Sequence, residues 1–306
     1  MNKTLIAIDK SQSYRVYLAI TTTAVEDARK LHQTTPLATA ALGRALTGAG
    51  LMGLLLKNDE DRLTVQFKGD GPVSEILVTA NGAGRVKGYI SNPDVELPLK
   101  ANGKLDVGGA IGTGTLTVIK DLGLKEPYVG RIDLVSGEIA EDLTAYYFLS
   151  EQQSTSFALG VRIDTDYTTL AAGGMMIQML PEAKPESVDA LEDMLSCMVP
   201  ISTLIEEVVK KSAGKTEEAI LDSLMDEIFR EMPEDFQTDR LEYREIVWNC
   251  DCSMERLEKV VVSIGAKDLR QIIEEDGQAE LVCQFCEKKY HFDKEHLEKL
   301  LKECTR

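Results

Sequence analysis

The sequence contains no apolar run long enough to cross a membrane. Its most apolar stretch, residues 45–56, lies between Arg44 and Lys57 and is well short of the ~20 residues that a spanning helix needs. The first residues carry one lysine and few apolar side chains before Asp9, which is too little for the apolar core of a secretion signal. We therefore expect a cytoplasmic protein that has no membrane partner.

Basic residues are scarce relative to acidic ones. The chain has 34 Lys and Arg against 51 Asp and Glu, which gives a net charge of -17 at pH 7. Binding to nucleic acid depends largely on lysine and arginine side chains that neutralise phosphates. The composition therefore argues against a nucleic-acid partner. Much of the acid lies between residues 182 and 249, which we interpret as the solvent-exposed faces of helices.

Few residues of the sequence suggest a catalytic site. The pattern places no serine or carboxylate beside His32 or His296, and His291 reads as a surface residue of a strand, so no catalytic triad is expected. The glycine-rich residues 108–114 are followed by a β-branched run, without the Gly-Lys-Ser/Thr of a phosphate-binding loop. We predict that the protein is not an enzyme.

The first 180 residues predict an α+β domain with a largely antiparallel sheet. Asn81-Gly82 and Asn102-Gly103 are typical of hairpin turns. Helices are expected at 23–32 and 37–56, the second rich in alanine and glycine and therefore buried, and at 137–152, where Ser136 is the expected N-cap. The expected strands are residues 5–8, 14–20, 63–67, 76–79, 86–90, 116–119, 158–163 and 175–180.

The pattern changes after Pro181. Apolar residues then recur at helical spacing, as in Ile201, Leu204, Ile205 and Val208, within an acidic background. We predict three parts: an N-terminal α/β core over residues 1–180, an acidic helical linker over 181–232, and a C-terminal domain over 233–306. In the last part, Ser253 is expected to cap a helix, and residues 280–292 to form a hairpin.

The cysteines fall mostly into two tight pairs. Cys250-Asp251-Cys252 is a C-x-C pair, and Cys283-Gln284-Phe285-Cys286 is a C-x-x-C pair. Two such pairs can supply a closed tetrahedral set of four thiolates, and soft thiolates without oxygen ligands favour zinc. The sequence therefore predicts one Zn²⁺ per chain, held by Cys250, Cys252, Cys283 and Cys286. We expect Cys197 to be a buried core residue and Cys304 to have no role.

A plain structural zinc site is one interpretation of this pattern, but close thiolates can also couple to each other if an oxidant removes the metal. Zinc contributes ~10–16 kcal/mol in small sites, and a domain is typically stable by only ~5–15 kcal/mol. Loss of zinc should therefore unfold the C-terminal segment. Two other classes remain open at this point: a zinc-ribbon regulator that binds nucleic acid, and a thiol–disulfide oxidoreductase that uses the C-x-x-C pair.

Four further motifs and the two cysteine pairs, taken together, resemble the 33-kilodalton heat-shock protein family of redox-regulated bacterial chaperones over essentially the whole chain. The motifs are GRALT at 43–47, KGDGP at 68–72, GTLTVIKD at 114–121 and LVSGEIAED at 134–142. Two positions depart from the family pattern. Glu287 stands where the family usually has glycine, and Trp248 where phenylalanine is common.

The resemblance implies a function as well as a fold. It implies a core domain, a helical linker folded on that core, and a zinc domain that holds the linker in place. It also implies that oxidation forms the disulfides Cys250–Cys252 and Cys283–Cys286, releases zinc and unfolds the linker. A homodimer would then bind unfolding client proteins without ATP and protect them from aggregation under oxidative stress.

Overall fold

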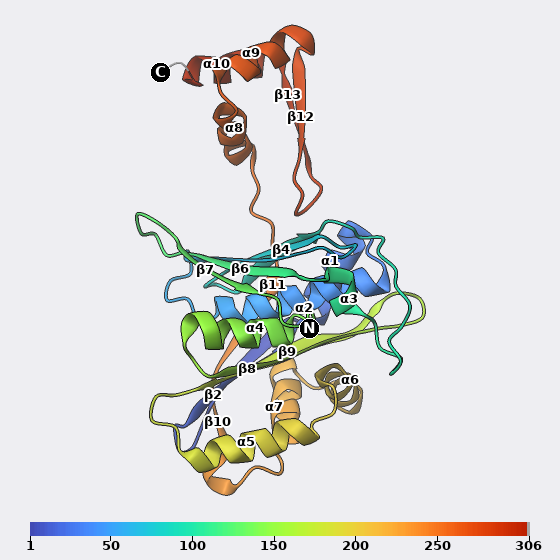
Figure 1. Cartoon of the computed structure of the whole chain (residues 1–306), viewed down its shortest axis with the longest axis vertical. Helices are drawn as coiled ribbons and strands as arrows, with labels where there is room; N and C mark the ends of the chain where they lie inside the picture. The colour runs from blue at the N-terminus through green and yellow to red at the C-terminus, as the bar shows by residue number, and fades with distance from the viewer. Residues whose placement is uncertain (305–306) are drawn as a thin grey trace. The chain divides into compact units, whose positions relative to one another are not determined.

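The computed structural model describes the backbone of residues 1–304 and the side chains of residues 1–303 (Figure 1). The chain forms two compact units, Met1–Asn249 and a second that begins at Cys250. They are called the first and second unit below. Among residues 1–304, no helix combines the length and the apolar composition needed to cross a membrane.

The first unit contains two sheets, so the predicted α+β fold with antiparallel sheets is confirmed. The first sheet has the order β10-β1-β2-β9-β8, and the second has the order β11-β5-β4-β3-β6-β7. All neighbouring strands are antiparallel except β11 and β5. The strands are β1 (Lys3–Asp9), β2 (Tyr14–Ile20), β3 (Arg62–Gly69), β4 (Glu75–Asn81), β5 (Arg85–Ile90), β6 (Gly114–Asp121), β7 (Tyr128–Asp133), β8 (Thr155–Ile163), β9 (Thr169–Met179), β10 (Thr238–Glu245) and β11 (Val247–Trp248).

Helix α2 (Pro36–Gly53) lies between the two sheets, beside α1 (Thr22–His32) (Figure 1). It begins at Thr35, whose hydroxyl accepts a hydrogen bond from the backbone N–H of Ala38, and Pro36 fits the first helical position. Its small residues permit the close packing. A Cβ at Gly43 would lie 2.7 Å from a Val25 methyl group and 2.8 Å from one of Val161. The predicted buried helix is therefore confirmed.

The helix expected at 137–152 differs from the prediction. Helix α4 begins only at Ala140, and it continues into a π-helical turn, η1 (Tyr147–Glu151). Ser136 does not cap it. The carboxylate of Asp142 instead accepts the backbone N–H groups of residues 135, 136, 137 and 139. The fully buried Asp142 carboxylate accepts four N–H groups at the start of the helix. It therefore stabilises this end more than the single hydroxyl of Ser136 could.

The turn at Asn81-Gly82 connects β4 to β5 as a hairpin, as predicted. Asn102-Gly103 also forms a turn, closed by Lys100 and Lys104, but it lies in the long loop between β5 and the short helix α3 (Val107–Ile111). It is therefore not a hairpin turn, because no strand flanks it.

The acidic segment after Pro181 forms α5 (Pro185–Cys197), α6 (Ile201–Lys211) and α7 (Glu217–Ile228). Figure 1 shows these helices on the side of the first sheet that faces away from α2. Their apolar residues, including Leu191, Ile205 and Leu224, form a second core with residues of β1, β2 and β9. The docking of the helical stripes on the N-terminal core is thus present in this state of the protein.

The expected boundary at 232/233 is wrong as a division between compact units. After the 3₁₀ turn η2 (Glu234–Phe236), β10 pairs with β1 and β11 pairs with β5, so residues 238–248 complete the sheets of the first unit. The compact second unit begins at Cys250. Strand β10 carries charged side chains on its exposed face and pairs with residues more than 200 positions away, which local pattern does not reveal.

The second unit consists of α8 (Met254–Ser263), α9 (Ala266–Glu275), the hairpin β12–β13 (Gln278–Val282 and Lys289–Asp293) and α10 (Lys294–Cys304). Ser253 caps α8 through a hydrogen bond from the backbone N–H of Arg256, as predicted. The core of the second unit is small and includes Leu269, Phe292 and Leu297. The predicted hairpin is confirmed.

Glu26 provides a test of how α1 is held. Its carboxylate accepts hydrogen bonds from Arg29 at 2.8 Å and from the backbone N–H of Thr169 at 3.0 Å, and the Arg29 bonds lower its pKa to about 2 despite burial. A lowered carboxylate pKa stabilises the fold above the unfolded pKa near 4.5, and the contribution is lost as pH falls toward 2. We predict that Glu26→Gln lowers the free energy of unfolding by about 1–2 kcal/mol at pH 7.

Urea unfolding between pH 7 and pH 3 measures this effect, and Glu60→Gln, at an exposed position, is the matched control. The difference between wild type and Glu26→Gln should shrink steadily below pH 4.5. A difference that stayed constant down to pH 3 would contradict this account of Glu26.

Candidate metal centre

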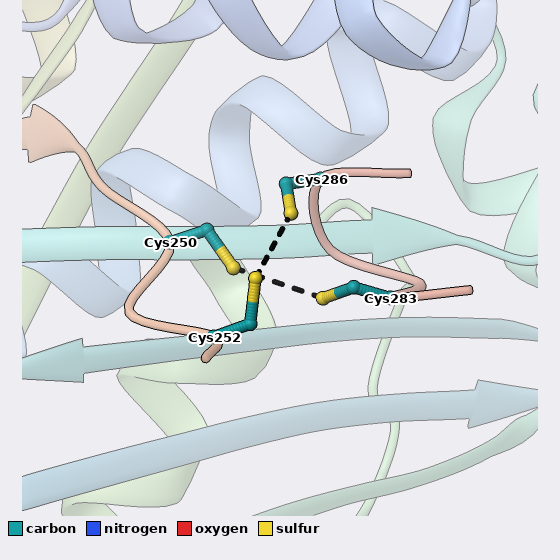
Figure 2. A group of neighbouring side chains, drawn as sticks. All are labelled: Cys250, Cys252, Cys283 and Cys286. Carbon is teal, nitrogen blue, oxygen red and sulfur yellow. Dashed lines mark hydrogen bonds between the residues drawn. The ribbon is translucent and has the colours of Figure 1, made fainter. Parts of the chain in front are cut away.

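Four cysteines of the second unit converge on one point (Figure 2). Cys250 and Cys252 lie on the extended segment that precedes α8, and Cys283 and Cys286 lie in the turn between β12 and β13. All four Sγ atoms lie within 4.8 Å of one another. The structure thus brings together the four residues that the sequence singled out.

The spacing of the sulfur atoms differs from that of disulfides. The Sγ atoms of Cys250 and Cys283 are 3.7 Å apart, and those of Cys252 and Cys286 are 3.3 Å apart. A disulfide needs about 2.05 Å, whereas a tetrahedral centre with Zn–S bonds of ~2.3 Å places its sulfurs about 3.8 Å apart. The arrangement is therefore that of reduced thiols around a common centre.

Backbone hydrogen bonds shape the turn that carries two of these sulfurs. The carbonyl of Cys283 accepts the N–H groups of Cys286 at 3.3 Å and Glu287 at 2.7 Å, while the Cys283 N–H donates to the carbonyl of Lys288 at 3.0 Å. Glu287 has a φ of +55°, in the left-handed region that favours glycine. A glycine at this position, which is usual in the family, would adopt this φ without strain. Glu287 adopts the same φ with strain.

Tyr290 on β13 contacts the cluster directly. Its hydroxyl donates a hydrogen bond to the Sγ of Cys252 at 3.1 Å. Burial raises the pKa of the Cys252 thiol, but the bonds from Tyr290 and the neighbouring thiols outweigh it and lower the pKa to about 7. Burial raises the pKa of the Cys286 thiol. Tyr290 is a site residue that the sequence analysis missed, although its place on the strand after the C-x-x-C pair was a signal.

The cysteines are part of the core of the second unit. Cys283 is buried beside Tyr290, Phe292 and Leu297, and the other three cysteines pack at the edge of the same cluster. The donor set fits a soft metal ion, because four sulfurs converge with no oxygen ligand among them. Whatever changes the state of these sulfurs must also disturb the packing of this unit.

The remaining cysteines do not join the cluster. Cys197 is exposed at the end of α5, so the prediction of a core position was wrong. In the last turn of α5, Met194 and Leu195 are partly buried against the second core, whereas Cys197 lies on the exposed side. The side chain of Cys304 lies outside the described residues.

The histidines also lie apart from the cluster of four sulfurs. His291 is an exposed residue of β13, as expected. His296, however, has a carboxylate partner that the sequence did not reveal: its Nε2 lies 2.7 Å from Glu258 Oε1, which links α10 to α8. His32 contacts the carbonyl of Gly88. Neither the His32–Gly88 contact nor the His296–Glu258 contact includes a serine, so neither is part of a catalytic triad.

Comparison with known proteins returns one family over nearly the whole chain. Residues 2–293 match the family described as Hsp33 protein. A 33 kDa chaperonin of Alkaliphilus oremlandii is 50% identical over 96% of this chain and 94% of its own length. One of Bacillus subtilis is 44% identical over 95% of both chains.

A solved structure has the same fold. The crystal structure of the 33 kDa chaperonin of Thermotoga maritima, a heat shock protein 33 homologue, superposes with a TM-score of 0.84 at 35% identity. The likeness covers 99% of both chains.

The strained turn provides a test of the site's local stability. Replacing Glu287 by glycine removes the left-handed strain of ~1–2 kcal/mol, part of which the greater freedom of glycine in the unfolded chain offsets. We predict that Glu287→Gly stabilises the β12–β13 turn by about 0.5–1 kcal/mol, as measured by slower hydrogen exchange of the hairpin amides. Lys288→Gly is the control, because Lys288 lacks a positive φ. Equal effects of the two variants would show that strain at Glu287 is unimportant.

Proposed function

Because this chain belongs to the Hsp33 protein family, we propose that it is a cytoplasmic chaperone that holds unfolding proteins without ATP and is switched on by oxidation of its four-cysteine cluster. The relatives carry the name of a chaperonin rather than of an enzyme, in agreement with the prediction that the chain is not an enzyme. The observation that carries the proposal is the convergence of four sulfurs within 4.8 Å in a chain that matches the family over residues 2–293.

In the inactive state, Cys250, Cys252, Cys283 and Cys286 would hold one Zn²⁺. Bound zinc would neutralise the thiolates and join the segment before α8 to the β12–β13 turn. Four thiolates leave no open position for a reacting water, so the metal would have a structural role. The hydrogen bond from Tyr290 supports this role, because it stabilises Cys252 as a thiolate.

Oxidation would replace the metal by two disulfides. Each pair of thiolates would give up two electrons to hydrogen peroxide, which takes two protons from the solvent and is reduced to two molecules of water, and one S–S bond would form. The oxidised pairs would no longer hold Zn²⁺, because a disulfide is a poor ligand. The pairing Cys250–Cys252 and Cys283–Cys286 follows the resemblance; the spacing of the sulfurs permits it, since each must move by less than about 3 Å to reach bonding distance.

Loss of the metal would lead to client binding through the helices α5–α7. Their apolar faces cover the first sheet, while their exposed faces carry the acidic excess of the chain. We propose that unfolding of the second unit releases these helices, and that the exposed apolar surface binds unfolding proteins and forms a homodimer. The second unit, with its small core, would be the sensor.

The oxidoreductase alternative loses support from the position of the C-x-x-C pair. Cys283 and Cys286 lie in a hairpin turn, not at the start of a helix in a βαβ unit. A reactive C-x-x-C pair gains its low pKa from a helix N-terminus, and that device is absent from the described hairpin.

Cysteine replacement tests the metal site. We predict one zinc per reduced chain by native mass spectrometry. Cys283→Ser should weaken zinc binding at least about a hundredfold, because it removes one of four ligands. Cys197→Ser is the matched control and should bind zinc as the wild type does, since Cys197 is exposed on α5. Equal loss of zinc in both variants would refute the ligand set.

Oxidation tests the switch. After treatment with peroxide and mild heat, the protein should contain two intrachain disulfides, no zinc, and a new ability to suppress aggregation of an unrelated unfolding protein without ATP. Light scattering of a heat-denatured substrate measures this activity. The reduced, zinc-loaded protein should be at least about tenfold less active. If the two forms were equally active, the switch would be absent, and at most a constitutive chaperone would remain.

Trypsin digestion of the reduced and oxidised proteins shows which segment unfolds on oxidation. Lys210, Lys211 and Arg230 lie on exposed faces and pair with acidic residues of the same helical segments. Cleavage needs local unfolding of the chain around them. Oxidation should therefore open sites at these residues and at Lys215, while residues 1–180 stay resistant. First cuts within residues 1–180 would contradict release of the helices.

A further inference from the structure

A cavity of about 430 Å³ lies within the first unit, apart from the cysteine cluster. Both sheets line it: Arg15 on β2 and Gln178 on β9 from the first, and Leu63 on β3 and Lys120 on β6 from the second. The end of α2 and the π-helical turn η1 complete the wall. A volume of this size is in the range of small-molecule sites, about 300–1,000 Å³.

One polar group of this wall is buried without a partner among the described residues. Arg15 makes no ion pair, its Nε is buried without a hydrogen bond, and its only bond is a long one of 3.5 Å from Nη1 to the hydroxyl of Tyr17. The side chains of Tyr147 and Gln178, which are 3% and 8% exposed, line the same cavity. Buried polar groups are nearly always paired, so the Nε of Arg15 indicates a missing acceptor.

The charge of the cavity indicates what that acceptor is. Its lining contains two cations, Arg15 and Lys120, and one carboxylate, Glu151. Glu151 is already engaged: it binds Lys120 Nζ at 2.7 Å and accepts the hydroxyl of Tyr146. The guanidinium of Arg15 is thus left without a counter-ion, and a partly buried charge is costly unless it is paired.

The backbone around the cavity is unusual in a way that agrees with a ligand site. Tyr147 and Glu151 are the first and last residues of the π-helical turn η1, and Gln152 after it has a φ of +54°. π-Helical turns are rare and occur often at functional sites, and left-handed non-glycine residues store strain there. This turn places Tyr147 and Glu151 together on the cavity wall.

We propose that this cavity binds a small organic anion, with a carboxylate or phosphate group on Arg15 and an apolar portion against the leucine-rich wall. The hydroxyls of Tyr17 and Tyr147 and the amide of Gln178 donate the remaining hydrogen bonds. Met52, Leu54, Leu55, Leu56 and Leu63 form the apolar wall, and its exposed surface comes from Leu55 and Leu56, because the other three are at most 6% exposed. This site is independent of the proposed redox switch, because its lining lies wholly within the first unit.

Calorimetric titration of the full-length, reduced protein tests the proposal with three probes: octanoate, octyl phosphate and 1-octanol. One of the two anions should bind saturably to one site, and the tighter of them identifies the anionic group. The alcohol has the same chain without the charge and should bind at least about tenfold more weakly. Equal binding of 1-octanol, or no saturable binding of either anion up to about 10 mM, would overturn the proposal.

Variants locate the binding. Arg15→Gln should lower the affinity for the preferred anion at least about tenfold, and Tyr147→Phe about threefold. Arg85→Gln is the matched control, since Arg85 is exposed on β5 outside the cavity, and it should bind within twofold of the wild type. Tyr147→Phe keeps the ring packed and decides the question if Arg15→Gln does not fold. Wild-type affinity in both cavity variants would refute the site.

Discussion

Four sulfur atoms lie within 4.8 Å of one another in the second unit, and four negative charges at that spacing repel one another strongly unless a cation lies among them. The cluster therefore has few stable states: neutral thiols, thiolates around a soft metal ion, or disulfides. The bond from Tyr290 favours a thiolate at Cys252, and burial favours the thiol at Cys286. Because Cys283 is also buried in the small core of this unit, the chemistry of the sulfurs and the packing of the unit cannot change separately.

Two opposing forces act on the helices α5–α7: burial of apolar residues and repulsion between acidic ones. Their apolar residues form a core with β1, β2 and β9, so burial favours docking. Their acidic faces add like charges to a chain that already carries a net charge of -17, and this repulsion opposes compaction. The core around α2, in contrast, lies between two sheets and consists of buried apolar residues. The proposed switch requires a difference in stability between these two cores, because the helices must leave while the rest stays folded.

The sequence was sufficient wherever local chemistry decides the structure. The cysteine pairs, the hairpin between them, the Ser253 cap and the alanine- and glycine-rich helix α2 all follow from short-range patterns. Most errors arose where distant partners decide. Strand β10 looks polar and forms because β1 offers a free edge on the side away from β2. The start of α4 was missed for a local reason, because the side chain of Asp142 accepts the backbone N–H groups that precede the helix. Cys197 continues an apolar stripe, but it lies on the exposed side of α5 while Met194 and Leu195 beside it are partly buried. The cavity around Arg15 draws on six separate segments, so no window of sequence could reveal it.

The position of the boundary at Asn249 also constrains how a signal could pass between the units. Residues 238–248 are held in both sheets of the first unit, through β1 and β5, and the first cysteine of the cluster follows directly. The same strand β10 lies immediately after α7 and the 3₁₀ turn, and Arg240 on it binds Asp226 of α7, while Tyr243 donates to Asp222 of the same helix at 2.7 Å. Strand β10 is thus bonded to the linker helices on one side and continuous with the cysteine segment on the other. If the helices leave as proposed, the bonds of β10 to α7 are those that would have to break, whereas Ile246 and β11, which follow β10, are held in the core around α2 and against β5.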